Sequence, residues 1–444
     1  MSSGRALGTA SGGARLTKRR RRWLLIVIAI AAAAIRLAVG RGLLRAESAL
    51  FSDMDVYDRL ADRLGGAVVE PWGALFPMGY PALLALLRGL FGRSYVVVSW
   101  VQALLGAATA VLTFLIGERL GGSPRVALLG AAIVTLHLPS IFYGSLLLSE
   151  VPASFLLTLG VCLLMGTTPR NAPGALRSAL SGAILGLACA LRPNFLILVL
   201  LLGSYLLLRW RPSEKVIVAG IGFLSGLVSI VAFVSWHNSR SLGHFTGLSG
   251  NGGINFFLSH SEYRGAVFEG MEVIPIRNAK YYTRFYKSPV PLYDEPFFYR
   301  EGLRLLTDDP WRLVRAIGNV SDGMGMGPLT YWPADEHALA LPRAWQIALR
   351  AFGLAFFPLL VMPALLSVSR AAEASPLAGL ADADRSLFLP VFLALIATLY
   401  LYLGDPRIHV PYVPLIAVAS ADGWMAIASW ARAGRQASTP PRVR

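Results

Sequence analysis

Long apolar runs recur along most of this chain, and they constrain its fold more than any other feature. Ten segments are almost continuously apolar: 23–40, 95–117, 125–143, 151–166, 178–191, 194–208, 216–236, 345–368, 387–403 and 410–430. A helix of about 20 apolar residues crosses the ~30 Å hydrocarbon core of a bilayer. Backbone polar groups in lipid must be satisfied within the segment, so each run is expected to be helical. The sequence therefore predicts an all-α polytopic membrane protein with about ten transmembrane helices.

Composition and charge agree with this prediction. Charged residues make up 15% of the chain, against about 25% in soluble proteins. The net charge of +16 is interpreted as membrane topology plus attraction to anionic lipid head groups. No basic and aromatic stripe lies in a soluble region, which excludes nucleic acid as a partner. The two cysteines, Cys162 and Cys189, fall within apolar runs and are expected to pack as small hydrophobic residues.

The distribution of basic residues predicts the orientation. Lys18 and Arg19 to Arg22 directly precede the first apolar run and should stay cytoplasmic. Alternation then makes every short inside loop basic and places both termini in the cytoplasm. We therefore expect a multi-pass protein of the plasma membrane, with its first span retained as an anchor. The short runs on either side of Pro193 leave an alternative open, in which they form one hairpin.

The predicted spans divide the chain into five parts. A basic cytoplasmic tail (1–22) precedes an N-terminal transmembrane module (23–236), whose first external loop is 41–94. A long external loop with surface helices (237–344) follows, then the C-terminal transmembrane helices (345–430) and a second cytoplasmic tail (431–444). The polar chemistry is thus expected mostly on the outer face.

Short helices are expected inside both long loops. Ser52–Leu64 is predicted to be amphipathic, with Val56, Leu60 and Leu64 on one face and Asp58 elsewhere. A second apolar helix is expected at 82–91. In the other loop, 294–317 is predicted to be helical with a break at Asp309-Pro310.

Three acidic residues lie where the predicted spans meet the outer face. Asp53 and Asp55 could act as a general base or bind a cation, or they could simply favour the first turn of a helix. Glu150 is equally consistent with a functional carboxylate at the membrane boundary and with a helix start after Ser149.

Two arginines, Arg192 and Arg407, fall at predicted outer span ends. The guanidinium fork suits a phosphate. The alternatives are extension to the interface and, for Arg407, pairing with Asp405. The six histidines show no metal-ligand spacing, and Asn251-Gly252-Gly253 is interpreted as a turn.

Several motifs follow one another in an order that resembles a known family. They are Ser52-Asp53-Met54-Asp55-Val56-Tyr57-Asp58-Arg59-Leu60-Ala61, Phe76-Pro77-Met78-Gly79-Tyr80-Pro81, Leu148-Ser149-Glu150-Val151-Pro152, Leu191-Arg192-Pro193-Asn194, Asn251-Gly252-Gly253-Ile254-Asn255-Phe256, Asp308-Asp309-Pro310-Trp311 and Gly404-Asp405-Pro406-Arg407-Ile408-His409-Val410-Pro411-Tyr412-Val413-Pro414. Together they resemble the GT-C superfamily of membrane glycosyltransferases, in particular the bacterial branch related to protein O-mannosyltransferases and aminoarabinose transferases. The resemblance runs from the first span to about residue 425.

The resemblance implies a polyprenyl-phosphate sugar as donor and a glycan, lipid or protein as acceptor. It favours Asp53 as base, because this residue lies four positions before Tyr57 as the family acid usually does. Asp55 stays a second candidate, since Met54 separates the two acids and the family's adjacent Asp-Glu pair is missing. Tyr57, Glu150, Arg192 and Arg407 are expected to bind substrate. No cofactor is implied, and a divalent metal is left open.

Other classes of function make different demands on the sequence. A transporter or flippase needs ionisable residues or broken helices near mid-membrane, whereas the mid-span residues here are nearly all apolar, with Gln102 an exception. An O-antigen ligase or polymerase would not need an acidic first-loop helix, and in a scaffold these acids would be dispensable. No sizeable soluble domain follows the last predicted spans, which disfavours the oligosaccharyltransferases.

Overall fold

The computed structural model of the chain describes residues 16–43, 50, 53–64, 74–121, 123–165, 173–209, 213–261, 274–275, 286–287, 294–326, 342–373, 387–402 and 404–437. This part of the chain is almost entirely helical, which confirms the predicted fold class. Two strands of two residues, β1 (Ile274–Pro275) and β2 (Tyr286–Lys287), pair in parallel.

Helices coincide with all ten predicted spans. The N-terminal ones are α1 (Lys18–Leu43), α5 (Tyr95–Gly121), α6 (Pro124–Leu136), α7 (Leu138–Tyr143), α8 (Glu150–Leu164), α9 (Ala175–Leu191), α10 (Phe195–Arg209) and α11 (Glu214–Leu242). The C-terminal ones are α16 (Arg343–Phe356), a π-helical turn (Phe357–Val361), α17 (Met362–Glu373), α19 (Phe388–Leu401), the 3₁₀ helix η3 (Pro406–Tyr412) and α20 (Val413–Ala437).

The two long loops hold the remaining helices. They are α2 (Asp53–Arg63) and α4 (Gly79–Phe91) in the first loop, and α12 (Gly252–His260), α13 (Glu295–Asp308), α14 (Trp311–Arg315) and α15 (Ile317–Gly323) in the second. The expected surface helix therefore breaks at Asp309 and Pro310 as predicted, because proline cannot donate to the preceding turn.

Among the described residues, five helical segments are long and apolar enough to cross a membrane: Lys18–Gly40, Tyr95–Leu120, Glu214–Leu242, Arg343–Arg370 and Pro406–Ala433. The helices α6, α8, α9, α10 and α19 are apolar but shorter. Apolar side chains such as Ile26 and Ile30 on α1 and Ile221 on α11 stay exposed, as expected of a surface that faces lipid. The chain is thus a polytopic membrane protein.

The described helices differ from the predicted segments at several points. The span expected at 125–143 breaks at His137, just before Pro139. Both expected tails are partly helical, since α1 begins at Lys18 and α20 continues to Ala437. The Asn251-Gly252-Gly253 turn is the start of α12. On either side of Pro193, α9 and α10 are two helices joined by a short link, which fits two spans and a hairpin equally.

Glycines bring α9 and α11 into close contact. A Cβ at Gly182 would lie 2.0 Å from the carbonyl oxygen of Phe223, and one at Gly226 would lie 2.0 Å from that of Ala179. Small residues let helix backbones approach closely where no hydrophobic force acts between them in lipid. This contact fixes α9, which positions Arg192 at its C-terminal end.

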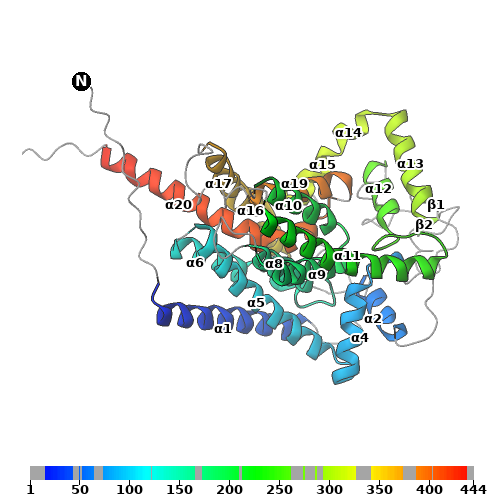
Figure 1. The fold of residues 1–444 in the computed structure, drawn as a ribbon, viewed down its shortest axis with the longest axis horizontal. Coiled ribbons are helices and arrows are strands. Elements are labelled where there is room, and N and C mark those ends of the chain that lie inside the picture. Colours follow the sequence, from blue (N-terminus) through cyan, green and yellow to red (C-terminus); the bar gives the residue numbers. More distant parts are fainter. Residues whose placement is uncertain are drawn as a thin grey trace, which may run out of the picture.

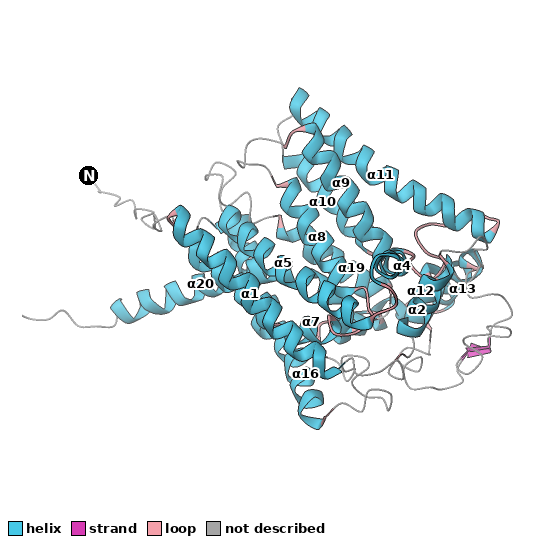
Figure 2. Cartoon of the chain, turned by 90° about the horizontal axis from the view of Figure 1, so that it is seen from below, coloured by secondary structure: helices cyan, strands magenta, loops and turns pink. Residues whose placement is uncertain are grey.

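The helices of the two long loops gather at one end of the bundle. Figure 1 shows the start of α1 and the end of α20 on the opposite side from α2, α4, α12 and α13. Figure 2 shows α2, α4, α12 and α13 close together beside the ends of the longer helices. The candidate site lies at this end.

Candidate active site

Four segments far apart in the sequence bring polar side chains together at the loop end of the bundle. Asp53 begins α2 and Glu150 begins α8, while Arg192 follows the last residue of α9 and Arg407 lies in η3. Helix starts and helix ends meet here because neighbouring spans run in opposite directions.

Arg407 is held between two carboxylates. Its Nη1 donates to Oδ2 of Asp53 at 2.9 Å, and its Nε lies 3.0 Å from Oδ2 of Asp405. Asp405 is the N-cap of η3 and accepts from the backbone N–H of Arg407 at 2.8 Å. Burial raises the pKa of Asp405, whereas the Arg407 guanidinium opposes that rise. The structure therefore confirms the pairing of Arg407 with Asp405 and adds a contact with Asp53, which the sequence did not indicate.

Glu150 and Arg192 form a second ion pair. Nη2 of Arg192 donates to Oε1 of Glu150, whose side chain is 1% exposed. The other carboxylate oxygen of Glu150 and Nε of Arg192 have no hydrogen-bond partner within the described part of the chain. Buried polar atoms without partners are costly. A hydroxyl donor would satisfy the Glu150 oxygen, and an acceptor oxygen would satisfy Nε of Arg192.

Tyr57 lies behind Asp53 and is buried. Its ring packs edge-on against Tyr80 at 5.2 Å and Phe76 at 6.2 Å between ring centres. Burial and the charges of Asp53 and Glu150 raise the pKa of Tyr57, so the phenol stays protonated. Tyr57 is thus a hydrogen-bond donor or a packing group beside the carboxylates, and not a base.

Asp55 is not brought into this cluster. It pairs with Arg59 one turn further along α2, and its side chain is 42% exposed. Only one of the two candidate acids therefore faces the arginines. Ser52, the first residue of the predicted amphipathic helix, lies outside the described residues.

Two residues of the neighbourhood were not singled out from the sequence. Asp405 entered only as an alternative partner for Arg407, although an aspartate before Pro406 is a common way to cap a turn. Asp58 was expected away from the apolar face of α2, yet it is 2% exposed. Its burial depends on partners from α4 and the start of α5, which a helical periodicity does not show.

The cluster contains three carboxylates and two guanidinium groups, those of Asp53, Glu150, Asp405, Arg192 and Arg407. Among the described residues, no group of three His, Cys, Asp or Glu side chains is arranged to hold a metal ion. The arrangement supplies a carboxylate on helix α2 in contact with the Arg407 guanidinium, which suits proton transfer next to an anionic leaving group.

Comparison with known proteins agrees with this chemistry. Residues 52–217 match the model of the dolichyl-phosphate-mannose-protein mannosyltransferase family. The matched stretch includes Asp53, Tyr57, Glu150 and Arg192, whereas Arg407 lies outside it. The predicted resemblance to GT-C membrane glycosyltransferases is confirmed for this stretch. No curated protein matches the chain.

Solved structures of the Archaeoglobus fulgidus oligosaccharyltransferase are also similar. The apo form is 11% identical with a TM-score of 0.48, and the match covers 95% of this chain and 52% of that one. AglB in complex with an inhibitory peptide and a dolichol-phosphate is 13% identical with a TM-score of 0.48, and the match covers 96% of this chain and 52% of that one. The chain spans about half the length of the solved structures it matches.

Proposed function

We propose that the chain is an inverting glycosyltransferase, because residues 52–217 match the model of the dolichyl-phosphate-mannose-protein mannosyltransferase family. It moves a sugar from a polyprenyl-phosphate donor to an acceptor hydroxyl at the outer face of the membrane. The observation that carries this proposal is the contact between Asp53 and Arg407, which are 354 positions apart in the sequence. This contact supports the proposal because a carboxylate suited to act as a base lies next to a guanidinium suited to bind phosphate.

Asp53 accepts the proton of the acceptor hydroxyl. The acceptor oxygen forms a bond to the anomeric carbon of the donor sugar, and the bond from that carbon to the phosphate oxygen breaks on the opposite side. The lipid phosphate leaves with the electron pair, and the configuration at the anomeric carbon inverts. Charge builds up on the phosphate as it leaves, so a guanidinium fixed beside it lowers the barrier.

Arg407 supplies this guanidinium. In the structure its Nη1 contacts Asp53 and its Nε contacts Asp405. Asp405 is held at the start of η3, so the donor phosphate displaces Asp53 from Arg407 rather than Asp405. Donor binding thereby frees the Asp53 carboxylate for the acceptor.

Arg192 and Glu150 contribute to substrate binding. Nε of Arg192 and the second oxygen of Glu150 are buried without partners in the described part of the chain. A phosphate oxygen satisfies the arginine, and a sugar or acceptor hydroxyl satisfies the carboxylate. The polyprenyl tail is expected to lie along the exposed apolar side chains of the neighbouring helices.

The orientation of the chain supports an outer-face reaction. The basic residues Lys18 to Arg22 begin α1, and Arg432 lies near the end of α20. Figure 1 shows these ends on the opposite side of the bundle from α2 and α4. Since basic flanks stay cytoplasmic, the cluster of Asp53 and Arg407 is expected at the outer face.

The test is transfer of radiolabelled sugar from polyprenyl-phosphate donors by the purified chain in lipid. Wild type is compared with Asp53→Asn, which keeps the shape but removes the base. We expect the transfer rate to fall about 100- to 10,000-fold. Arg59→Gln, which breaks an exposed pair on the same helix, is expected to keep wild-type activity.

Two results would count against the proposal. Equal transfer by wild type and Asp53→Asn would exclude Asp53 as the base. Movement of intact lipid-linked sugar across the bilayer without transfer to any acceptor would favour the transporter alternative.

A further inference from the structure

A second polar cluster, which the proposed mechanism does not use, surrounds Asp58 on α2. The Asp58 carboxylate accepts from Nη2 of Arg88 and from Nη2 of Arg93, the latter at 2.5 Å. The hydroxyl of Tyr95 lies 3.2 Å from both carboxylate oxygens. A carboxylate that is 2% exposed therefore has three donors.

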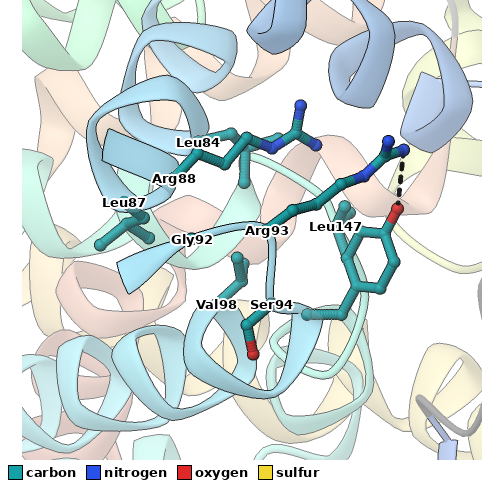
Figure 3. Close-up of a pocket in the computed structure, with 9 residues that line it drawn as sticks. Leu84, Leu87, Arg88, Gly92, Arg93, Ser94, Val98 and Leu147 are labelled. Atoms are coloured by element: carbon teal, nitrogen blue, oxygen red, sulfur yellow. Dashed lines mark hydrogen bonds between the residues drawn. The ribbon is translucent and has the colours of Figure 1, made fainter. Parts of the chain in front are cut away.

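These donors come from three consecutive segments of the chain. Arg88 belongs to the last turn of α4, Arg93 to the link that follows, and Tyr95 begins α5. Nη1 of Arg88 also donates to the backbone carbonyl of Asp58 at 2.8 Å and to the carboxylate of Asp62. Figure 3 shows the Arg88 and Arg93 side chains extending in the same direction beside a small surface pocket. The cluster thus attaches both the backbone and a side chain of α2 to α4 and α5.

Stability alone does not require such a cluster. Replacing a buried ion pair with well-packed apolar residues is often neutral or stabilising. What charged hydrogen bonds add is direction, because guanidinium and carboxylate groups bind in a defined plane. The buried apolar side chains of α2, such as Tyr57 and Leu60, pack the helix against the bundle. These contacts constrain the rotation of α2 about its axis less than the charged hydrogen bonds do.

Rotation of α2 matters because Asp53 lies on the same helix. Asp53 and Asp58 are about 7.5 Å apart along the helix axis, at about 1.5 Å per residue. A turn of roughly 20° moves a group about 5 Å from the axis by nearly 2 Å. A displacement of that size breaks the 2.9 Å contact between Asp53 and Arg407.

We propose that Asp58 is a positioning residue: through Arg88, Arg93 and Tyr95 it fixes the rotation of α2 so that Asp53 faces Arg407. This inference rests on the proposed function, in which Asp53 is the base. It predicts a defect in the chemical step rather than in donor binding, because Arg192 and Arg407 bind the phosphate from other helices.

Asp58→Asn tests the kinetic consequence. We expect kcat for sugar transfer to fall about 10- to 100-fold, while the KM for the donor changes less than about threefold. The matched control is Arg59→Gln, which removes an ion pair on the exposed side of the same helix and is expected to leave kcat within about twofold. Arg93→Gln, whose side chain is 50% exposed, is a milder second variant that removes one donor and keeps the carboxylate.

A second measurement follows the position of α2 without any transfer assay. Spin labels are placed at Arg59→Cys on α2 and Val96→Cys on α5, while the two native cysteines are buried. The distribution of distances between the two spin labels should be narrow when Asp58 is present. It should broaden or shift in Asp58→Asn and, to a smaller extent, in Arg93→Gln.

The two measurements separate the failure of this inference from that of the proposed function. An unchanged distance distribution in Asp58→Asn overturns the positioning role, and so does a changed distribution with wild-type kcat. If wild type transfers no sugar but the distribution still broadens, Asp58 does fix α2 and only the proposed function fails.

Discussion

Removing the cation that joins Asp53 to Asp405 is the sharpest perturbation of the site. Arg407→Gln keeps a polar side chain of similar length but leaves two carboxylates without their shared guanidinium. At contact distances of 2.9 and 3.0 Å, each attraction is worth roughly 5 to 6 kcal/mol before desolvation, with an effective dielectric constant of about 20. Desolvation offsets most of this, and removing one partner of a buried pair costs about 3 to 5 kcal/mol.

The loss should depend on pH in a defined direction. Burial raises the pKa of Asp405, and the Arg407 guanidinium is the largest influence that lowers it. In Arg407→Gln the pKa therefore rises further. A carboxyl whose pKa is higher in the folded than in the unfolded state destabilises the fold as pH rises through that folded pKa. The free energy of unfolding of Arg407→Gln should be closest to that of wild type at acidic pH and furthest below it at neutral pH.

Thermal unfolding in lipid nanodiscs, from about pH 5 to about pH 8, measures this difference. Sugar transfer measured in parallel should fall about 100- to 1,000-fold, because the charge on the leaving phosphate loses its fixed donor. Arg59→Gln serves as the control. A variant with wild-type unfolding at every pH would refute the proposed burial of the pair, and wild-type transfer would refute Arg407 as the phosphate ligand.

Two further predictions concern packing and substrate binding. A Cβ at Gly226 would lie 2.0 Å from the carbonyl oxygen of Ala179, so Gly226→Leu should lower the free energy of unfolding by about 1 to 3 kcal/mol. The control is Gly203→Ala, whose added Cβ would lie 3.7 Å from its nearest neighbour and which should unfold as wild type does. Equal stability of the two variants would contradict the close contact of α9 and α11. Glu150→Gln removes the negative charge that pairs with Arg192, whose side chain is 13% exposed. We expect kcat/KM for sugar transfer to fall about 10- to 100-fold. An unchanged kcat/KM would exclude Glu150 and Arg192 from substrate binding.

Much of the fold could be predicted from local pattern. Apolar runs such as those that form α1 and α11 are long enough for a bilayer, and the rule that backbone must be satisfied in lipid makes them helical. Proline and charge also predicted the surface helix that breaks at Asp309. Where a proline lies near a span end, as at Pro139, pattern alone did not show that the helix would break there.

The sequence also narrowed the candidate site to a few polar residues at span ends. Position in the helix did not separate Asp53 from Asp55, because both occupy the first turn of α2 and both suit the helix dipole. The preference for Asp53 rested on the family resemblance alone. The packing of the helices gives the two acids different partners, since Asp53 contacts Arg407 and Asp55 contacts Arg59. This difference is why we propose Asp53 as the base.

The sequence by itself determined that this chain is a helical membrane protein whose charged residues lie at the span ends, because the cost of burying polar groups in lipid acts on each segment separately. The tertiary structure alone decided which charges meet. The pairs of Arg407 with Asp53 and of Arg192 with Glu150 join residues 354 and 42 positions apart. Such pairing depends on how helices pack and rotate against one another, and no local pattern encodes that.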